Sequence, residues 1–217
     1  MKSDSQLEQD VRDELHWDPS VNEAEIAIAV KGGVVTLLGG VSDYAQKLAA
    51  ERAVTRVSGV RTIAEELKVR LPNTTQRTDR EIAQAALGAM AWSTAVQKDR
   101  VTLKVEQGWV TLDGTLEWYY QRQAAEDVVR GMLGVMGVTN LIRVMPKASK
   151  VEVKSKIENA LKRSAEIDSQ RINVEAINGK VTLKGSVRSW AERRDAELAA
   201  WAAPGVADVD DLLTVTG

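Results

Sequence analysis

The feature that most constrains this 217-residue chain is a seven-residue pattern, Gly-x-Val-Thr-Leu-x-Gly, which occurs three times. Its copies are residues 33–39, 108–114 and 179–185, and a Gly-Val pair follows 26 residues after the first glycine of each copy. The intervals of 75 and 71 residues between copies are longer than a solenoid repeat and match a small independent domain. The sequence therefore predicts three modules, which we number one to three and place at residues 1–73, 77–146 and 148–217.

Each module opens with a pattern typical of an amphipathic helix. In module one, Leu7, Val11 and Leu15 are spaced to share one helical face, and Ser3 precedes them as an N-cap residue. The equivalent apolar residues are Ile82, Ala86 and Met90 in module two, and Val153, Ile157 and Leu161 in module three.

The period then changes to two, which predicts a β-hairpin. Ile26, Ile28 and Val30 alternate with alanines before the turn position Gly32. Gln107 and Asn178 take the Gly32 position in the other modules. Glycine and asparagine tolerate the positive φ angles that primed hairpin turns require.

A second helix and a last strand complete each module. We expect the helices at residues 43–57, 117–133 and 189–202, each ended by a C′ glycine: Gly59, Gly134 and Gly205. The last strands follow at 60–69, 135–144 and 206–215. A helical crossover joins parallel strands, so the sheet should be mixed. The predicted fold class is α+β: three tandem two-layer α-β-β-α-β sandwiches, each with two helices packed on a three-stranded sheet.

These repeats resemble the BON domain family. The resemblance rests on the first helix, the Gly-x-Val-Thr-Leu-x-Gly strand, the alanine-rich helix and the Gly-Val turn into the last strand. Asn140 matches an asparagine common in the last strand of the family, whereas Glu65 and Asp211 depart from it. The resemblance implies an association with the osmotic or envelope stress response, with phospholipid surfaces or with secretin-type pores. In one relative it implies an association with potassium. It brings no catalytic residue.

Composition and spacing argue against enzymatic chemistry. The chain has no cysteine, and its one histidine, His16, has no equivalent in the other modules and no nucleophile at a suggestive spacing. The densest acidic cluster, residues 208–211, should point to both faces of a strand, which disfavours a metal site. We expect no cofactor. No module is basic enough to predict a nucleic-acid partner, since residues 1–73, 74–146 and 147–217 carry net charges of −3, 0 and +1.

Module two carries extra aromatic residues. Tyr119 occupies an aromatic position common to all modules and Trp92 aligns with Trp17, so both are expected to serve the fold. Trp109, Trp118 and Tyr120 replace small or charged residues of the other modules. Their expected role is either packing against a neighbouring module or binding lipid headgroups or an unfolded client.

Two hypotheses about function follow. The first is a non-enzymatic stress protein that docks on phospholipid surfaces. Its predicted contact residues are Trp109, Trp118, Tyr120, Arg122, Lys150 and Lys154, the last two in a basic run at the first helix of module three. The alternative is a multivalent protein-interaction scaffold or chaperone without lipid binding. Residues 1–6 contain no apolar run, so a cytoplasmic location is expected, or a periplasmic one if a leader has been removed.

Overall fold

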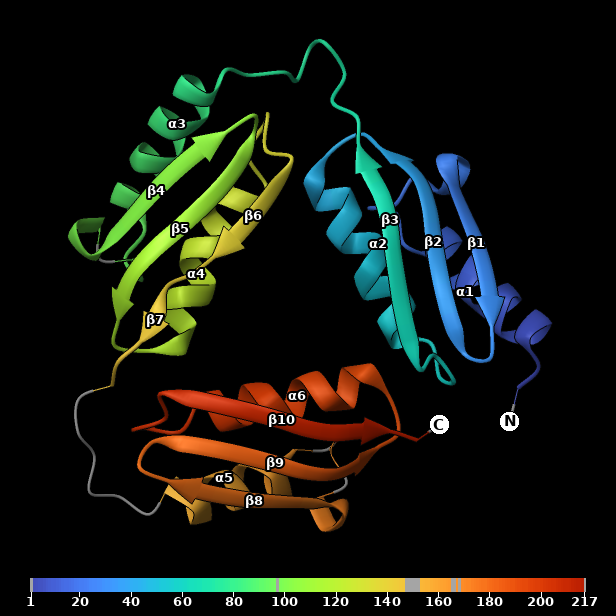
Figure 1. The fold of residues 1–217 in the computed structure, drawn as a ribbon, viewed down its shortest axis with the longest axis vertical. Helices are drawn as coiled ribbons and strands as arrows, with labels where there is room; N and C mark the ends of the chain where they lie inside the picture. The colour runs from blue at the N-terminus through green and yellow to red at the C-terminus, as the bar shows by residue number, and fades with distance from the viewer. Residues whose placement is uncertain (1, 97, 147–152, 165–166, 168, 217) are drawn as a thin grey trace. The chain divides into compact units, whose positions relative to one another are not determined.

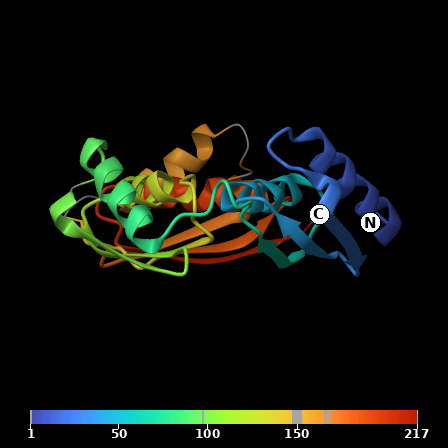
Figure 2. The same cartoon turned by 90° about the horizontal axis from the view of Figure 1, so that it is seen from above.

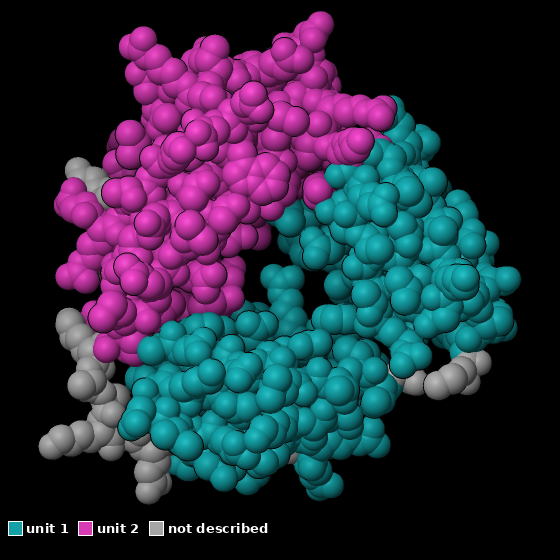
Figure 3. Space-filling model, viewed as in Figure 1, with its two compact units in different colours: residues 1–39, 48–67, 148–217 teal, residues 40–47, 68–147 magenta. Residues whose placement is uncertain are grey.

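The computed structural model describes residues 2–96, 98–146, 153–164, 167 and 169–216 (Figure 1). Each module contains two helices and one sheet. Residue contacts divide the chain into two compact units, residues 1–39, 48–67 and 148–217, and residues 40–47 and 68–147 (Figure 3). The modules are therefore described one at a time.

The elements follow the same order in every module. Module one contains α1 (Asp4–Trp17), β1 (Ile26–Lys31), β2 (Val34–Val41), α2 (Tyr44–Arg56) and β3 (Thr62–Val69). Module two contains α3 (Asp79–Trp92), β4 (Val101–Glu106), β5 (Trp109–Leu116), α4 (Tyr119–Arg130), β6 (Gly137–Asn140) and β7 (Arg143–Val144). Module three contains α5 (Val153–Arg163), β8 (Ile172–Ile177), β9 (Lys180–Val187), α6 (Trp190–Trp201) and β10 (Asp208–Val215). A short 3₁₀ turn precedes the first strand of each module: Glu23–Glu25, Lys98–Arg100 and Ser169–Arg171.

The strand bearing the repeated pattern is central in each sheet. It pairs antiparallel with the preceding strand, as in β1–β2, β4–β5 and β8–β9. The last strand pairs parallel with it in β5–β6 and β9–β10. The sheets are thus mixed, and the predicted fold class is confirmed.

Both helices of a module cover the same face of its sheet, as module three shows (Figure 2). In module two that layer buries Ile82, Ala86 and Met90 of α3 against Val110 and Leu112 of β5. The three α3 residues are those that the helical spacing predicted to face the core.

The hairpin turns have the primed geometry expected from the sequence. Both turn residues have positive φ in each module: Gly32 (59°) and Gly33 (80°), Gln107 (50°) and Gly108 (77°), and Asn178 (50°) and Gly179 (82°). Two successive positive φ angles define a type I′ turn. Gln107 shows that the second position alone requires glycine throughout.

An aspartate at the start of the first helix holds this turn in two modules. Asp4 accepts hydrogen bonds from the amides of Gly32 (2.9 Å) and Gly33 (3.4 Å). Asp79 accepts from the amides of Gln107 and Gly108, both at 2.8 Å. Each carboxylate therefore links the start of the first helix to the turn of the hairpin.

Two expectations about element boundaries are wrong. The second helices end at Arg56, Arg130 and Trp201, three or four residues before Gly59, Gly134 and Gly205, so these glycines are not C′ residues. In α4 the C-cap is Gly131, whose amide donates to the Val129 carbonyl. Gly134 instead occupies a further turn, at φ 88°, where a Cβ atom would lie 2.7 Å from Cβ of Arg77. The glycine is required by that close approach rather than by helix termination.

The last strand of module two is also interrupted, between β6 and β7, where a continuous strand was expected. The Ile142 amide there donates to the Asn140 side chain (3.2 Å). Parallel pairing with β5 resumes at β7, so the break is local.

Module one contains an acid-sensitive ion pair. Asp18 accepts a hydrogen bond from the Ser20 hydroxyl (2.5 Å) and pairs with Arg56 (3.0 Å). These contacts, the Ser20 bond first, hold the pKa of Asp18 below its ordinary value. A depressed folded-state pKa stabilises the fold above the unfolded pKa, and this stabilisation is lost as pH falls through the folded value.

We expect Asp18→Asn to lower the stability of module one at pH 7 by about 1 kcal/mol, since Arg56 is partly solvent-screened. Urea unfolding at pH 7 and at pH 3 measures this effect. The variant should lose less stability on acidification than the wild type. Equal losses in the two proteins would show that Asp18 does not contribute to the acid sensitivity.

Candidate functional site

The most unusual surface of the described residues is the outward side of α3. Residues 82–97 contain no ionisable side chain. This is unexpected because only one side of α3 packs against the hydrophobic core of module two. After the first turn of α3, where Arg80 and Glu81 are exposed, the exposed residues of the helix are all uncharged. They are Gln84, Ala85, Leu87, Gly88, Ala91 and Trp92, which we call the outer face of α3. Leu87 is 56% exposed and Trp92 is 90% exposed. The helix thus presents apolar side chains in two directions.

The same helical positions are polar or charged in the other modules. The residues equivalent to the first five of the outer face are Gln9, Asp10, Arg12, Asp13 and His16 in α1, and Ser155, Lys156, Glu158, Asn159 and Lys162 in α5. The fold tolerates charge at these positions, so the apolar set in α3 is not a requirement of the fold. We infer that the exposed apolar residues of α3 serve a role that is specific to module two.

Trp92 corrects a sequence expectation. It was expected, like Trp17, to serve the fold, yet the two side chains are 90% and 83% exposed. Each is the last residue of its helix, after the buried residue Leu15 or Met90, so the helical rotation turns the indole away from the sheet. Arg163 takes this position in module three. Helical spacing could have placed the tryptophans outside, but their repetition favoured a role in the fold.

The structure separates the predicted contact residues of module two. Trp109 begins the eight-residue strand β5, whereas Trp118 and Tyr120 lie beyond its other end. Trp109 is 48% exposed, its indole nitrogen donates to the Thr139 hydroxyl (2.8 Å), and its ring covers Gly137. Trp109 therefore packs along the sheet and does not join the other two aromatics.

Trp118, Tyr120 and Arg122 lie at the start of α4. Trp118 is half-buried, and its amide donates to the buried Gln121 side chain (3.1 Å). Tyr120 is 60% exposed. Arg122 donates to the Asn140 carbonyl (3.2 Å) and lies 5.8 Å above the Tyr119 ring, so its charge is engaged within the module.

The contact between α4 and the last strand recurs in module three. Arg193, equivalent to Arg122, donates to the Asp211 carboxylate (2.7 Å), which also accepts from the Leu213 amide (3.0 Å). Asn140 and Asp211 therefore serve the same purpose with different chemistry. The sequence departure at this position preserves the contact.

Of the two lysines predicted as contact residues in module three, one lies on α5. Lys154 is exposed on α5 and lies 3.7 Å from Glu158. Lys150 lies outside the described residues.

The described residues offer little for catalysis. His16 pairs with Glu23 (2.7 Å) at an exposed position. Asp208 and Asp210 face Lys180 at 3.6 and 3.5 Å while Asp211 faces α6, so the acidic cluster points to both sides of β10 as expected. No group of three potential metal ligands occurs in the described part of the chain.

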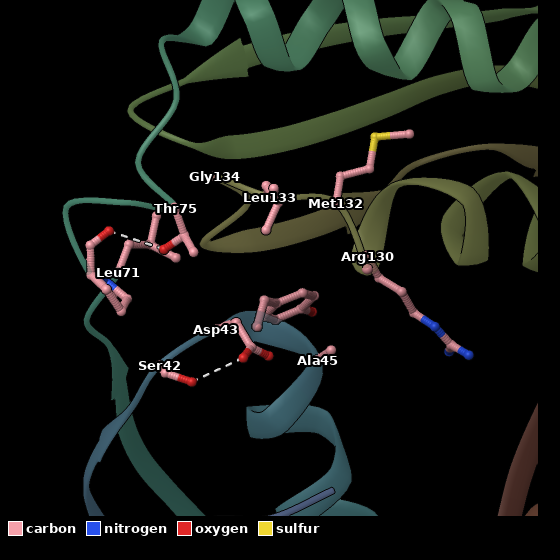
Figure 4. A pocket seen from close by; sticks show the side chains of 12 residues that line it. Ser42, Asp43, Ala45, Leu71, Thr75, Arg130, Met132, Leu133 and Gly134 are labelled. Atoms are coloured by element: carbon pink, nitrogen blue, oxygen red, sulfur yellow. Dashed lines mark hydrogen bonds between the residues drawn. The ribbon is translucent and has the colours of Figure 1, made fainter.

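One pocket in the second compact unit is lined by the start of α2, the segment 71–75 and the turn 130–134 (Figure 4). Its polar groups are engaged locally: the Ser42 hydroxyl donates to Asp43 (3.0 Å) and the Thr75 hydroxyl to the Pro72 carbonyl (3.0 Å). The lining residues include no histidine or lysine. This pocket does not resemble a catalytic centre.

Comparison with known sequences decides the family. The BON domain profile matches residues 3–70, 78–146 and 149–217. The chain belongs to the BON domain family. The three matches account for nearly the whole chain, so each repeated α-β-β-α-β unit is a BON domain.

A relative among characterised proteins is the osmotically-inducible protein Y of Escherichia coli (strain K12). It is 30% identical over 128 residues, which are 55% of this chain and 64% of that protein. The chain thus matches less than two thirds of the relative's length. Among solved structures, CdsD, a structural protein of the type III secretion system of Chlamydia trachomatis, aligns over 97% of this chain and 92% of its own. With 15% identity and a TM-score of 0.27, that likeness supports no functional argument.

Proposed function

We propose that this protein is a non-enzymatic protein of the osmotic or envelope stress response that associates with phospholipid surfaces through its BON domains. The outer face of α3, an uncharged surface ending in the 90% exposed Trp92, carries the proposal. The similarity to an osmotically-inducible protein supports the stress assignment.

The shape and chemistry of α3 suit an interface between water and lipid. A helix with apolar residues on its free side can lie in the plane of a membrane surface, with a tryptophan at headgroup level. No helix in the described residues is long and apolar enough to span a bilayer, so α3 would lie on the surface. Residues 77–100 hold four basic and three acidic side chains. The contact should therefore depend mainly on apolar burial and only weakly on salt.

Pelleting with phospholipid vesicles tests the proposal. We expect the full-length protein to sediment with vesicles of phosphatidylethanolamine and phosphatidylglycerol, and Trp92→Ala to reduce the bound fraction more than Trp118→Ala does. Trp118 is the matched control because it is a half-buried tryptophan of the same module. The absence of binding to charged and neutral vesicles alike, at low salt, would reject a membrane role.

A multivalent protein-interaction scaffold remains the second proposal, and the surface gives it less support. Three equal sites would need a common exposed surface, whereas the outer face of α3 has charged counterparts on α1 and α5. Suppression of aggregation of a heat-denatured client distinguishes the two. A protein that protects the client and ignores vesicles would favour the scaffold.

A further inference from the structure

Trp190, the first residue of α6, makes a contact outside its own module. Within the first compact unit, its indole nitrogen donates a hydrogen bond to the Val60 carbonyl of module one (3.1 Å). Val60 is 1% exposed and belongs, with Gly59, to the Gly-Val pair that every module repeats. Arg193 lies 5.0 Å above the Trp190 ring and pairs with Asp211 (2.7 Å). The ring is therefore held in place from within module three.

The same kind of contact recurs in the second compact unit. Tyr44, the first residue of α2, occupies the position of Trp190 and packs against the hydrophobic core of module two. It lines a pocket together with Met132 and Gly134, in the turn that leads to the Gly-Val pair of module two (Figure 4). Two aromatic residues at one helical position thus reach the same turn of another module.

A second contact accompanies each aromatic one. In the first unit, residues 215–216 at the end of β10 line a pocket together with the hairpin turn of module one. In the second unit, Leu71, two residues after β3, lines the equivalent pocket with the hairpin turn of module two. The same two different surfaces therefore meet in both units, which is the property of a heterologous interface.

The two pairs of modules differ in how the chain connects them. Modules one and two are consecutive, so the linker of residues 70–78 already keeps Tyr44 close to module two. Modules one and three are separated in the sequence by the whole of module two, so no short linker brings Trp190 to the Val60 carbonyl. A contact that recurs without the linker indicates that the two surfaces are complementary.

We propose that the turn before the last strand of a BON module is a docking site for the aromatic residue that starts the second helix of another BON module. In this chain the Gly59–Val60 turn binds Trp190, so module three docks on module one. The buried Val60 carbonyl is the acceptor, and the ring, already fixed by Arg193, loses little conformational entropy when it binds. The contact involves no residue of α3, so its test does not depend on the membrane proposal.

Nuclear Overhauser effects in the unmodified full-length chain test the contact directly. We expect cross-peaks between the indole N–H proton of Trp190 and the α-protons of Val60 and Arg61. That N–H proton should also exchange with solvent at least about tenfold more slowly than the indole N–H of Trp17, whose side chain is 83% exposed. A mixture of two differently labelled chains reports whether the contact lies within one chain. The absence of these cross-peaks, or their appearance only between chains, would overturn the proposal.

Spin labels measure whether Trp190 holds the two modules together. The chain has no cysteine, so labels can be attached at Arg12→Cys and Asn173→Cys, two exposed positions of the first unit. We expect one narrow distribution of distances between them. Trp190→Ala should roughly double its width, because modules without a stable interface reorient. Trp190→Tyr, which introduces the residue found at Tyr44, should keep the distribution narrow, and so should the control Trp17→Ala.

Three results would contradict the docking site. The first is a Trp190→Ala distribution as narrow as that of the wild type. The second is equal broadening by Trp17→Ala, which would indicate a general effect of losing a tryptophan. The third is broadening by Trp190→Tyr as large as that by Trp190→Ala, because a site for aromatic residues should accept tyrosine.

Discussion

Replacing Gly39 by alanine should unfold module one under conditions in which the wild-type chain is folded. Gly39 has a φ of 129°, which side chains rarely adopt, and a Cβ atom built there would overlap the Glu25 carbonyl oxygen. The 3₁₀ turn before β1 crosses the strand at this point, so the obstruction is backbone and cannot move aside as a side chain would. Strain of about 1–3 kcal/mol adds to the displacement of the turn. The backbone strain and the displacement of the turn together approach the free energy of unfolding of a domain of this size, roughly 4–10 kcal/mol.

The matched control is Gly32→Ala in the same module. Gly32 also has a positive φ (59°), but nothing lies within 4 Å of a Cβ atom built there. That variant should lose only about 1–2 kcal/mol from the left-handed conformation. Urea unfolding followed through the NMR signals of each module distinguishes the two. Equal losses would mean that the contact with Glu25 is not the reason for glycine at position 39.

Placing a charge in the outer face of α3 should have the largest effect on vesicle binding. We expect Leu87→Glu to lower the vesicle partition coefficient roughly 10- to 100-fold, because burying a leucine contributes about 1.5–3 kcal/mol and each 1.4 kcal/mol is a factor of ten. Leu87 is 56% exposed and outside the core of module two, so the fold should be retained. Arginine and glutamate occupy the equivalent positions of α1 and α5, which supports this expectation.

Leu198→Glu on α6 controls for the added negative charge. Leu198 is 39% exposed on a helix of module three and makes no part of the outer face of α3. Vesicle binding should be close to that of the wild type in this variant. If both variants lose binding equally, the repulsion of an acidic protein by the vesicle explains the loss, and α3 is not the docking element.

Most of the scaffold was predictable because it is repeated. Three aligned copies show that Gly33, Gly108 and Gly179 are required by the turn, while Gln107 shows that the preceding position is not restricted to glycine. The ends of the second helices were misplaced because Gly59, Gly134 and Gly205 lie in a further turn that has no distinct sequence signal.

The candidate site was less predictable. Trp109 is an aromatic residue that the other modules lack and Arg122 is a predicted contact residue, yet Trp109 donates to Thr139 and Arg122 to the Asn140 carbonyl. Such partners come from strands distant in the sequence, so composition could not reveal them. The alignment of Trp92 with Trp17 favoured a role in the fold. Repetition shows only that the two modules share a tryptophan at this position, and not which way its side chain points.

The sequence by itself determined the number of modules, the order of helices and strands, the mixed sheet and the BON family, because local periodicity and turn chemistry are written in neighbouring residues and three copies reinforce one another. Only the tertiary structure decided which aromatic side chains are exposed and which carboxylates hold the hairpins of modules one and two. Those properties depend on which face of a helix meets the sheet and which amides meet an acceptor, and both are set by contacts between segments far apart in the chain.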